Sequence, residues 1–129
     1  MNILLDTHAL IWFITDNDKL PIKTKKIIES KENRCYVSIA SLWEMGIKNS
    51  IGRLELNINL DDIFSTIEKT GFDILPITTQ HILKNSELEF FHQDPFDRII
   101  IAQSIVENID IITIDKKFSN YNVSLIWKK

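Results

Sequence analysis

The chain has 129 residues, of which 44% are apolar, enough to build the core of one domain without disulfide support. Its net charge is −3 and its pI is near 5.6, so it lacks the broad basic field with which proteins coat nucleic acid. A phosphate-bearing partner would have to be held locally or through a metal ion. The single cysteine, Cys35, has nothing to pair with in the chain, which fits a reducing cytoplasm and a small buried side chain.

No targeting or membrane-spanning segment is predicted. The N-terminus has no cationic stretch, and the longest apolar run, Ala9 to Ile14, is far shorter than the roughly 20 residues that span a bilayer. Repeats, low-complexity segments and linkers are absent from the sequence. We therefore expect one cytoplasmic domain over residues 1–129 that does not enter a membrane.

Short β-type runs alternate with longer segments of helical spacing. In chain order, the strands are expected at 2–5, 35–38, 73–77, 110–114 and 123–127. The helices are expected at 8–15, 22–31, 40–50, 60–70, 79–87 and 96–108. Such alternation predicts βαβ units with right-handed crossovers, and hence a parallel sheet with helices on both faces.

Four acidic residues fall where parallel α/β folds bind ligands, which is beyond the carboxyl ends of the strands. Asp6 directly follows the first expected strand, and Asp115 follows the fourth. Glu44 lies early in the helix after the second strand, and Asp97 lies in the first turn of the helix before the fourth. By topology, all four carboxylates point at one edge of the sheet.

Each of these acids also has a purely structural explanation. An aspartate at a strand-to-helix junction can cap free backbone N–H groups. Asp94, followed by Pro95, is a helix start of this kind, and the pair Ser41 and Glu44 fits a capping box.

The four acids together favour a metal site. Carboxylates crowded at one strand edge repel and raise one another's pKa values unless a cation lies between them. A hard divalent cation such as Mg²⁺ prefers oxygen ligands, and the histidine or cysteine spacing of zinc sites is absent. The residues therefore predict an acidic, oxygen-only site of the kind used in phosphodiester hydrolysis.

Several blocks of the sequence, in order and with family-like spacing between about residues 2 and 127, resemble PIN-domain ribonucleases, and most closely the VapC-like toxins of bacterial toxin–antitoxin systems: "LLDTHALIW", "VSIASLWEMGIK", "GRLEL", "LPIT", "DPFDRIIIAQ" and "IITIDKKFSNYNVSLIW". The resemblance implies a three-layer α/β/α sandwich with a central parallel sheet of four or five strands. It also implies an endoribonuclease that depends on Mg²⁺ or Mn²⁺. In such an enzyme, water activated by the metal attacks phosphorus and leaves a 5′-phosphate and a 3′-hydroxyl.

Carried over by motif, the resemblance names the catalytic and metal-binding acids as Asp6, Glu44, Asp97 and Asp115. It also maps small hydroxyl residues, expected to orient the carboxylates or the water, to Thr7, Ser38 and Thr113. Asp94 is first a helix cap and second an outer-sphere metal contact. Arg98 would touch a phosphate or pair with Asp94 or Asp97.

Some basic and aromatic side chains near these acids are candidates for RNA contacts. Lys48 is first the ion-pair partner of Glu44. The further bases are Arg53, Lys116 and Lys117, and each taken singly is first an ordinary solvated residue. His92, next to the "DPFD" motif, is the best candidate among the histidines, while His8 is expected to pack or hydrogen-bond at a helix start. Phe90 and Phe91 could stack on bases, although core packing is the preferred interpretation.

Two kinds of protein partner are expected. The run Ala9 to Ile14 is apolar on every side of its helix, so it is either fully buried or covered by another chain, which favours a homodimer. The resemblance implies a co-encoded antitoxin that crosses a hydrophobic groove, with Trp12 and Trp43 either lining it or buried in the core.

Other classes of protein fit the sequence less well. A receiver-type phosphoacceptor needs an aspartate after the third strand, where this chain has "LPIT", and a haloacid-dehalogenase-like phosphatase needs Asp-x-Asp, where it has Asp6-Thr7-His8. The alternative left open is a catalytically inactive PIN-fold module that binds RNA or protein, because a fold alone does not establish activity.

Overall fold

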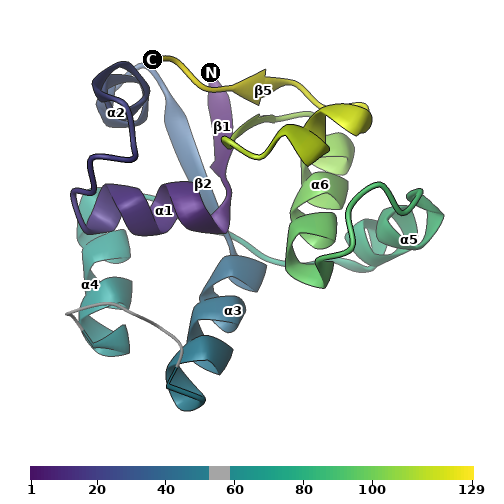
Figure 1. Ribbon diagram of the computed structural model, residues 1–129, viewed down its shortest axis with the longest axis horizontal. Coiled ribbons are helices and arrows are strands. Elements are labelled where there is room, and N and C mark those ends of the chain that lie inside the picture. Colours follow the sequence, from purple (N-terminus) through teal and green to yellow (C-terminus); the bar gives the residue numbers. More distant parts are fainter. Residues whose placement is uncertain (53–58) are drawn as a thin grey trace.

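A five-stranded parallel sheet lies at the centre of the computed structural model, which describes residues 1–52 and 59–129. The strand order is β3-β2-β1-β4-β5 (Figure 1). The strands are β1 (Asn2–Leu5), β2 (Arg34–Ser38), β3 (Asp73–Leu75), β4 (Asp110–Ile112) and β5 (Leu125–Ile126). The helices are α1 (Thr7–Ile14), α2 (Ile22–Glu29), α3 (Ile39–Ser50), α4 (Leu60–Thr70), α5 (Thr79–Glu87) and α6 (Pro95–Glu107), with a 3₁₀ helix, η1 (Lys116–Asn120).

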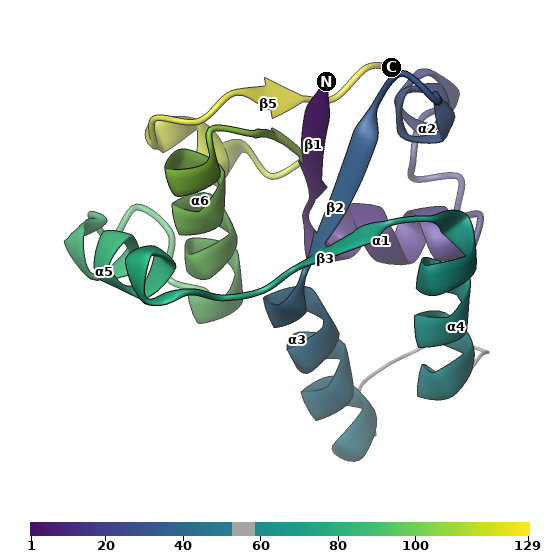
Figure 2. The same cartoon turned by 180° about the vertical axis from the view of Figure 1, so that it is seen from behind.

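Helices cover both faces of the sheet, which confirms the predicted sandwich. Figure 2 shows α1, α2 and α4 on one side of the strands and α5 and α6 on the other. Because successive side chains of a strand point to opposite faces, β1 contributes to two cores. Ile3 and Leu5 pack with the first group of helices, whereas Leu4 packs with Ile100 and Ile101 of α6.

The elements match the expected ones except at their ends. β3 stops at Leu75, because Pro76 has no N–H with which to continue the ladder. The last two strands are shorter than expected, and η1 was not predicted. The α3 helix begins after Ser38, whose hydroxyl accepts the Ala40 N–H at 3.0 Å, so the capping box predicted at Ser41 is wrong.

The apolar α1 helix is covered within the chain. Trp12 lies against Trp127, with ring centroids 6.2 Å apart, and Phe13 lies against Phe72 at 5.5 Å. The apolar side chains of residues 11–14 are thus partly buried within the chain itself, and the homodimer expected from this helix stays a prediction. Among the helices of the described residues, none has the length and apolar character that crossing a membrane requires.

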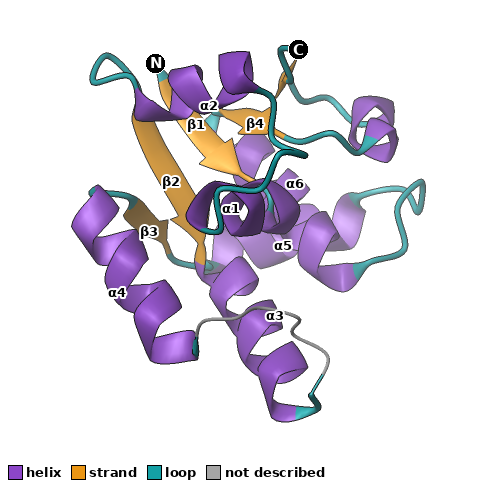
Figure 3. Ribbon diagram, turned by 60° about the vertical axis from the view of Figure 1, so that its left-hand side comes forward, coloured by secondary structure: helices purple, strands orange, loops and turns teal. Residues whose placement is uncertain are grey.

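The strand order places a switch point at β1. The chain adds β2 and β3 on one side of β1 and β4 and β5 on the other, and ligands of open α/β sheets bind at such points. Figure 3 shows the arrowheads of β1 and β2 directed toward the starts of α1 and α3. The Asp6 N–H donates to the Ile112 carbonyl at 3.1 Å, which continues the β1–β4 pairing into the residues that follow both strands.

Gln103 connects the α6 layer to the sheet. Its side chain is fully buried, and its Oε1 accepts the Ser38 hydroxyl at 2.6 Å. Its Nε2 donates to the carbonyls of Leu75 and Pro76 at 3.4 and 3.2 Å. One amide thus satisfies polar groups at the ends of both β2 and β3.

Replacing this amide by a hydrocarbon of similar size should weaken the fold. We expect Gln103→Leu to lower the free energy of unfolding by about 1–3 kcal/mol, because a buried hydroxyl and two carbonyls lose their partner. Urea unfolding measures the difference. The control is Gln80→Leu at an exposed position of α5, and equal losses in the two variants would contradict the role assigned to Gln103.

Candidate functional site

Asp6 is held rigidly at the end of β1. Its side chain is only 3% exposed, and its Oδ1 accepts the Ala9 N–H at 2.8 Å, which caps α1. The Thr113 hydroxyl, just beyond β4, donates a short hydrogen bond to Oδ2. Asp6 is therefore both the cap of a helix and a buried acid facing the neighbouring strand.

Glu44 reaches the same edge from α3. Lys48, one turn further along the helix, donates to its Oε2 at 2.7 Å, which confirms the predicted ion pair. The other oxygen, Oε1, is buried and has no hydrogen-bond partner within residues 1–52 and 59–129. A buried carboxylate oxygen without a partner is energetically unfavourable. A bound cation or water would remove this cost, so Oε1 is a candidate ligand atom.

Asp97 and Asp115 meet on either side of His92. Asp97 lies in the first turn of α6, and Asp115 caps η1 by accepting the Lys117 N–H at 2.9 Å. His92 Nε2 is 2.9 Å from Asp115 Oδ2 and 3.2 Å from Asp97 Oδ2. One possible ligand atom from each of these three residues lies within 4.8 Å of the others.

The electrostatics show that all the acids face one place. Burial is the largest cause, and together with the nearby charges of Asp94, Asp6, Glu44 and Asp115 it raises the pKa of Asp97 to about 8. Burial also raises the pKa of Asp6, against the lowering effect of the Thr113 hydrogen bond. Without a counter-ion, Asp97 thus carries a proton at neutral pH.

The site fits a hard divalent cation. Its donors are carboxylate oxygens from four separate segments, and at least one of them, Glu44 Oε1, lacks a partner among the described residues. Oxygen donors with room for retained water are what Mg²⁺ and Mn²⁺ prefer. A cation would replace the proton on Asp97 and offset the mutual repulsion of the acids.

A family model for the PIN domain matches residues 3–123. The chain belongs to the PIN domain family. Nuclease activity is typical of this family. A comparison with curated proteins found no match.

Solved structures with the same fold include chains of three toxin–antitoxin assemblies. VapBC2 from Rickettsia felis, bound to promoter DNA, matches with a TM-score of 0.76 and 17% identity over 99% of this chain and 100% of that one. VapBC-1 from nontypeable Haemophilus influenzae matches with a TM-score of 0.68 and 20% identity, over 98% of this chain and 97% of that one. A toxin–antitoxin complex from Klebsiella pneumoniae matches with a TM-score of 0.65 and 18% identity, over 96% of this chain and 95% of that one. At these identities the likeness shows that this PIN domain shares their fold.

The hydroxyl residues expected near the acids of this PIN domain divide into two groups. Thr113 contacts Asp6 and also accepts the Asp115 N–H at 3.0 Å, so it links two of the acids. Thr7 instead hydrogen-bonds to Ser41 at 2.9 Å, and Ser38 caps α3 and donates to Gln103. The contacts of Thr7 and Ser38 therefore orient helices and strands, not the carboxylates.

Two expectations for the "DPFD" motif have different outcomes. Asp94 is confirmed as the cap of α6, because its Oδ1 accepts the N–H groups of Phe96 and Asp97 at 2.9 and 3.4 Å. Among the described residues, Arg98 forms no ion pair with an acid, and its burial leaves it little access to a phosphate. It is 5% exposed, and its guanidinium donates to the Tyr121 hydroxyl and to the carbonyls of Asn85, Leu88, Glu89 and His92.

His92 is the residue whose position the sequence interpretation missed. It was expected to reach outward to RNA, yet it is buried and faces Asp97 and Asp115. The opposite error was made for Phe90 and Phe91, which were expected to pack in the core but are exposed. The sequence did contain a sign that His92 is buried. It stands two residues before Asp94, which caps α6, and in an extended chain neighbouring side chains such as those of Phe91 and His92 point to opposite sides.

The remaining candidate bases lie around the site or outside the described part. Lys116 and Lys117 are exposed in η1, directly after Asp115. Arg53 and the rest of the "GRLEL" block after Gly52 fall on residues 53–58, which lie outside the described residues. His8 is exposed, with its ring 5.8 Å from that of Trp12.

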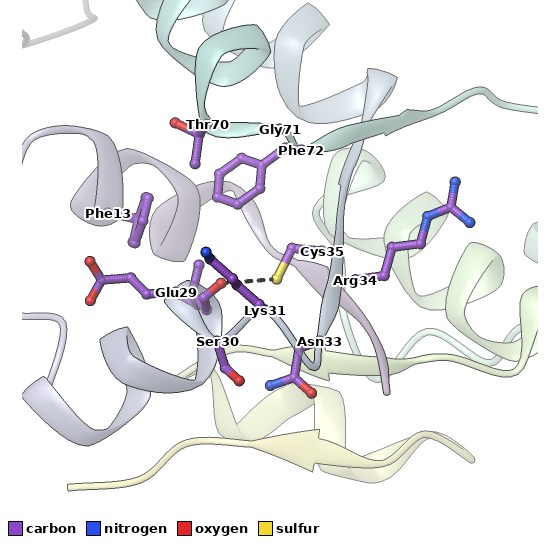
Figure 4. A pocket seen from close by; sticks show the side chains of 11 residues that line it. Phe13, Glu29, Ser30, Lys31, Asn33, Arg34, Cys35, Thr70, Gly71 and Phe72 are labelled. Atoms are coloured by element: carbon purple, nitrogen blue, oxygen red, sulfur yellow. Dashed lines mark hydrogen bonds between the residues drawn. The ribbon is translucent and has the colours of Figure 1, made fainter.

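A separate cavity of about 530 Å³ lies at the opposite edge of the sheet, at the amino ends of β2 and β3 (Figure 4). Phe13, Phe72 and Cys35 line it, and the Arg34 side chain points away from it toward Asp73, with which it pairs at 2.7 Å. Burial raises the pKa of Cys35 to about 11, so its thiol stays neutral and unreactive. This cavity contains none of the four acids.

The raised pKa of Asp97 predicts how the metal-free protein responds to pH. Between the ordinary value of 3.8 and about 8, the folded state holds a proton that the unfolded chain releases. The free energy of unfolding therefore falls as the pH rises through this range, by up to about 1.4 kcal/mol per pH unit. Asp97→Asn cannot ionise, so it should flatten this slope and be the more stable protein at the upper end of the range.

Urea unfolding of both proteins between about pH 5 and pH 8, in the presence of a chelator, measures the effect. Parallel stability curves for the wild type and Asp97→Asn would contradict the proton assigned to Asp97.

Proposed function

We propose that this PIN domain is a Mg²⁺- or Mn²⁺-dependent endoribonuclease and the toxin of a cytoplasmic toxin–antitoxin pair. The proposal rests on two observations: Glu44 Oε1 is buried without a partner among the described residues, and the pKa of Asp97 is raised by burial and then by the charges of the other acids. The family supports nuclease chemistry, and the neighbours with the same fold come from toxin–antitoxin complexes.

In this proposal the four acids, Asp6, Glu44, Asp97 and Asp115, hold the metal. A divalent cation bound there would polarise a phosphoryl oxygen of RNA and lower the pKa of a bound water. Thr113 orients Asp6, and Lys48 fixes Glu44. Asp94 contributes negative charge and the α6 cap from outside the ligand set. Lys116 and Lys117 lie close enough in sequence to Asp115 to contact phosphates beside the cleaved bond.

Cleavage of RNA tests the function directly. Purified protein should cut total RNA with Mg²⁺ or Mn²⁺, stop when a chelator is added, and leave 5′-phosphate ends. Asp6→Asn keeps the shape of the side chain but removes its charge, and we expect a loss of activity of about 100-fold or more. Asp61→Asn, at an exposed position in α4, is the control and should retain full activity.

Three outcomes would count against the proposal. Equal cleavage by Asp6→Asn would end the assignment of these acids, and a 2′,3′-cyclic phosphate product would exclude water as the attacking group. RNA binding by the wild type without cleavage would favour the alternative, a catalytically inactive PIN-fold module that binds RNA or protein.

We also propose that the protein forms a homodimer through an apolar hollow between α3, α5 and α6. The hollow has a volume of about 300 Å³, and its lining includes Trp43, Ile82 and Phe96. Trp43 is 63% exposed, with its ring 5.4 Å from that of Phe96. Large exposed aromatic side chains of this kind are enriched at protein interfaces. Trp12 is half-buried against Trp127, so Trp43 is the exposed one of the two tryptophans expected at an antitoxin groove.

A charge in this hollow should separate the two copies. Light scattering after gel filtration is expected to give a dimer for the wild type and a monomer for Trp43→Glu, because an interface excludes an unpaired carboxylate. The control is Ile22→Glu, an exposed apolar position on α2, which should remain dimeric. A wild-type monomer would overturn the proposed dimer, and an unchanged dimer in Trp43→Glu would exclude this surface.

A further inference from the structure

We propose that His92 is a positioning residue of the metal site: its Nε2–H holds the Asp97 and Asp115 carboxylates side by side, at the spacing that a shared cation needs. This inference rests on the proposed function, because it assigns a role within the same site. His92 is buried, and its Nε2 lies 2.9 Å from Asp115 and 3.2 Å from Asp97. It comes from a segment that contributes none of the four acids.

The backbone fixes the tautomer of this histidine. The Asp94 N–H, which can only donate, points to His92 Nδ1 at 3.2 Å. Nδ1 is therefore the acceptor nitrogen, and the ring proton is on Nε2, which faces the two carboxylates. An Nε2 that carries a proton cannot ligate a metal, so His92 acts on the carboxylates and not on the cation.

The segment that carries His92 is itself held in place by buried donors. The His92 N–H donates to the Tyr121 hydroxyl at 2.8 Å, and that hydroxyl donates to the Glu89 carbonyl at 2.6 Å. Arg98 donates to four carbonyls between Asn85 and His92. The ring edge of His92 also packs against Phe118, at 5.5 Å between centroids. The imidazole therefore has little freedom to move when the acids or their ligand change.

The contact suits two acids that must share a cation. The Nε2–H donates to Asp115 Oδ2, Asp97 Oδ2 lies 3.2 Å from the same nitrogen, and each carboxylate oxygen has a second lone pair left for a metal. Partners that orient metal-binding groups in this way typically contribute 10–100-fold to metal affinity. His92 thus prepares the two acids before the cation arrives.

The test compares Mn²⁺ binding, measured by calorimetry and by the electron paramagnetic resonance of Mn²⁺, in variants of His92. His92→Phe keeps a ring but removes the N–H, and we expect its Mn²⁺ affinity to fall by about 10–100-fold. His92→Gln places an amide N–H at similar reach and should recover most of the affinity. Equal affinities of wild type and His92→Phe, or no recovery in His92→Gln, would overturn the proposal.

His81 provides a matched control within the same chain. It is buried, its Nδ1 accepts the Thr78 N–H at 3.0 Å, and its Nε2 is 2.8 Å from Glu107. This is the arrangement of His92, built away from the acids. His81→Phe should therefore lose stability but keep the wild-type Mn²⁺ affinity, and a matching drop in its affinity would show that the His92 effect is only structural.

A measurement on the wild type keeps the proposal testable even if His92→Phe fails to fold. Nitrogen-15 NMR of the His92 ring should show a protonated Nε2 and an unprotonated Nδ1, both without metal and with Mg²⁺. A coordination shift at Nε2 on adding Mg²⁺, or a proton on Nδ1, would overturn the proposal.

The results also separate this inference from the proposed function. A wild type that binds Mn²⁺ and cleaves RNA, with His92→Phe unchanged in affinity, overturns the role of His92 alone. Mn²⁺ binding that depends on His92, without RNA cleavage, supports the role and overturns the nuclease. A wild type that binds no Mn²⁺ overturns both.

Discussion

Repulsion among buried carboxylates is the constraint that organises this molecule. A parallel sheet sends the ends of β1 and β4 to one edge, and the starts of α3 and α6 meet them there. The acids that this topology brings together cannot all stay charged in a poorly solvated place. The fold answers with a proton on Asp97, a lysine on Glu44 and a hydroxyl on Asp6. The same carboxylates are the oxygen donors that the proposed function assigns to a divalent cation.

The rest of the architecture supports that edge from behind. Gln103 joins the ends of β2 and β3 to α6, and Arg98 fixes the segment before α6 through its carbonyls. A buried guanidinium that satisfies several carbonyls gives a loop the rigidity of a regular element. The positions of the acids are therefore set by helices, strands and one immobilised loop, which is the kind of support that a preorganised site requires.

Sequence reasoning could reach the fold and the placement of the acids, because both follow from periodicity and from topology. The alternation of β-type and helical runs is a long-range pattern, and it survives errors of a few residues at the ends. The orientation of single side chains was beyond it. Arg98 looked like a phosphate ligand because its charge is visible in the sequence, whereas the carbonyls that surround it are not. Phe90 and Phe91 looked like core residues because hydrophobicity does not say which side of a loop faces the solvent.

Two of the acids serve the fold with one oxygen and the site with the other. Asp6 and Asp115 each cap a helix through Oδ1, while Oδ2 faces the opposite strand or His92. An asparagine could keep the capping oxygen and lose only the charge, whereas an alanine would lose both. Replacing one of these aspartates by asparagine would thus preserve the fold but remove a charge that the site needs. In evolution, such a chain could therefore lose catalysis and keep binding its partner while every intermediate sequence still folds.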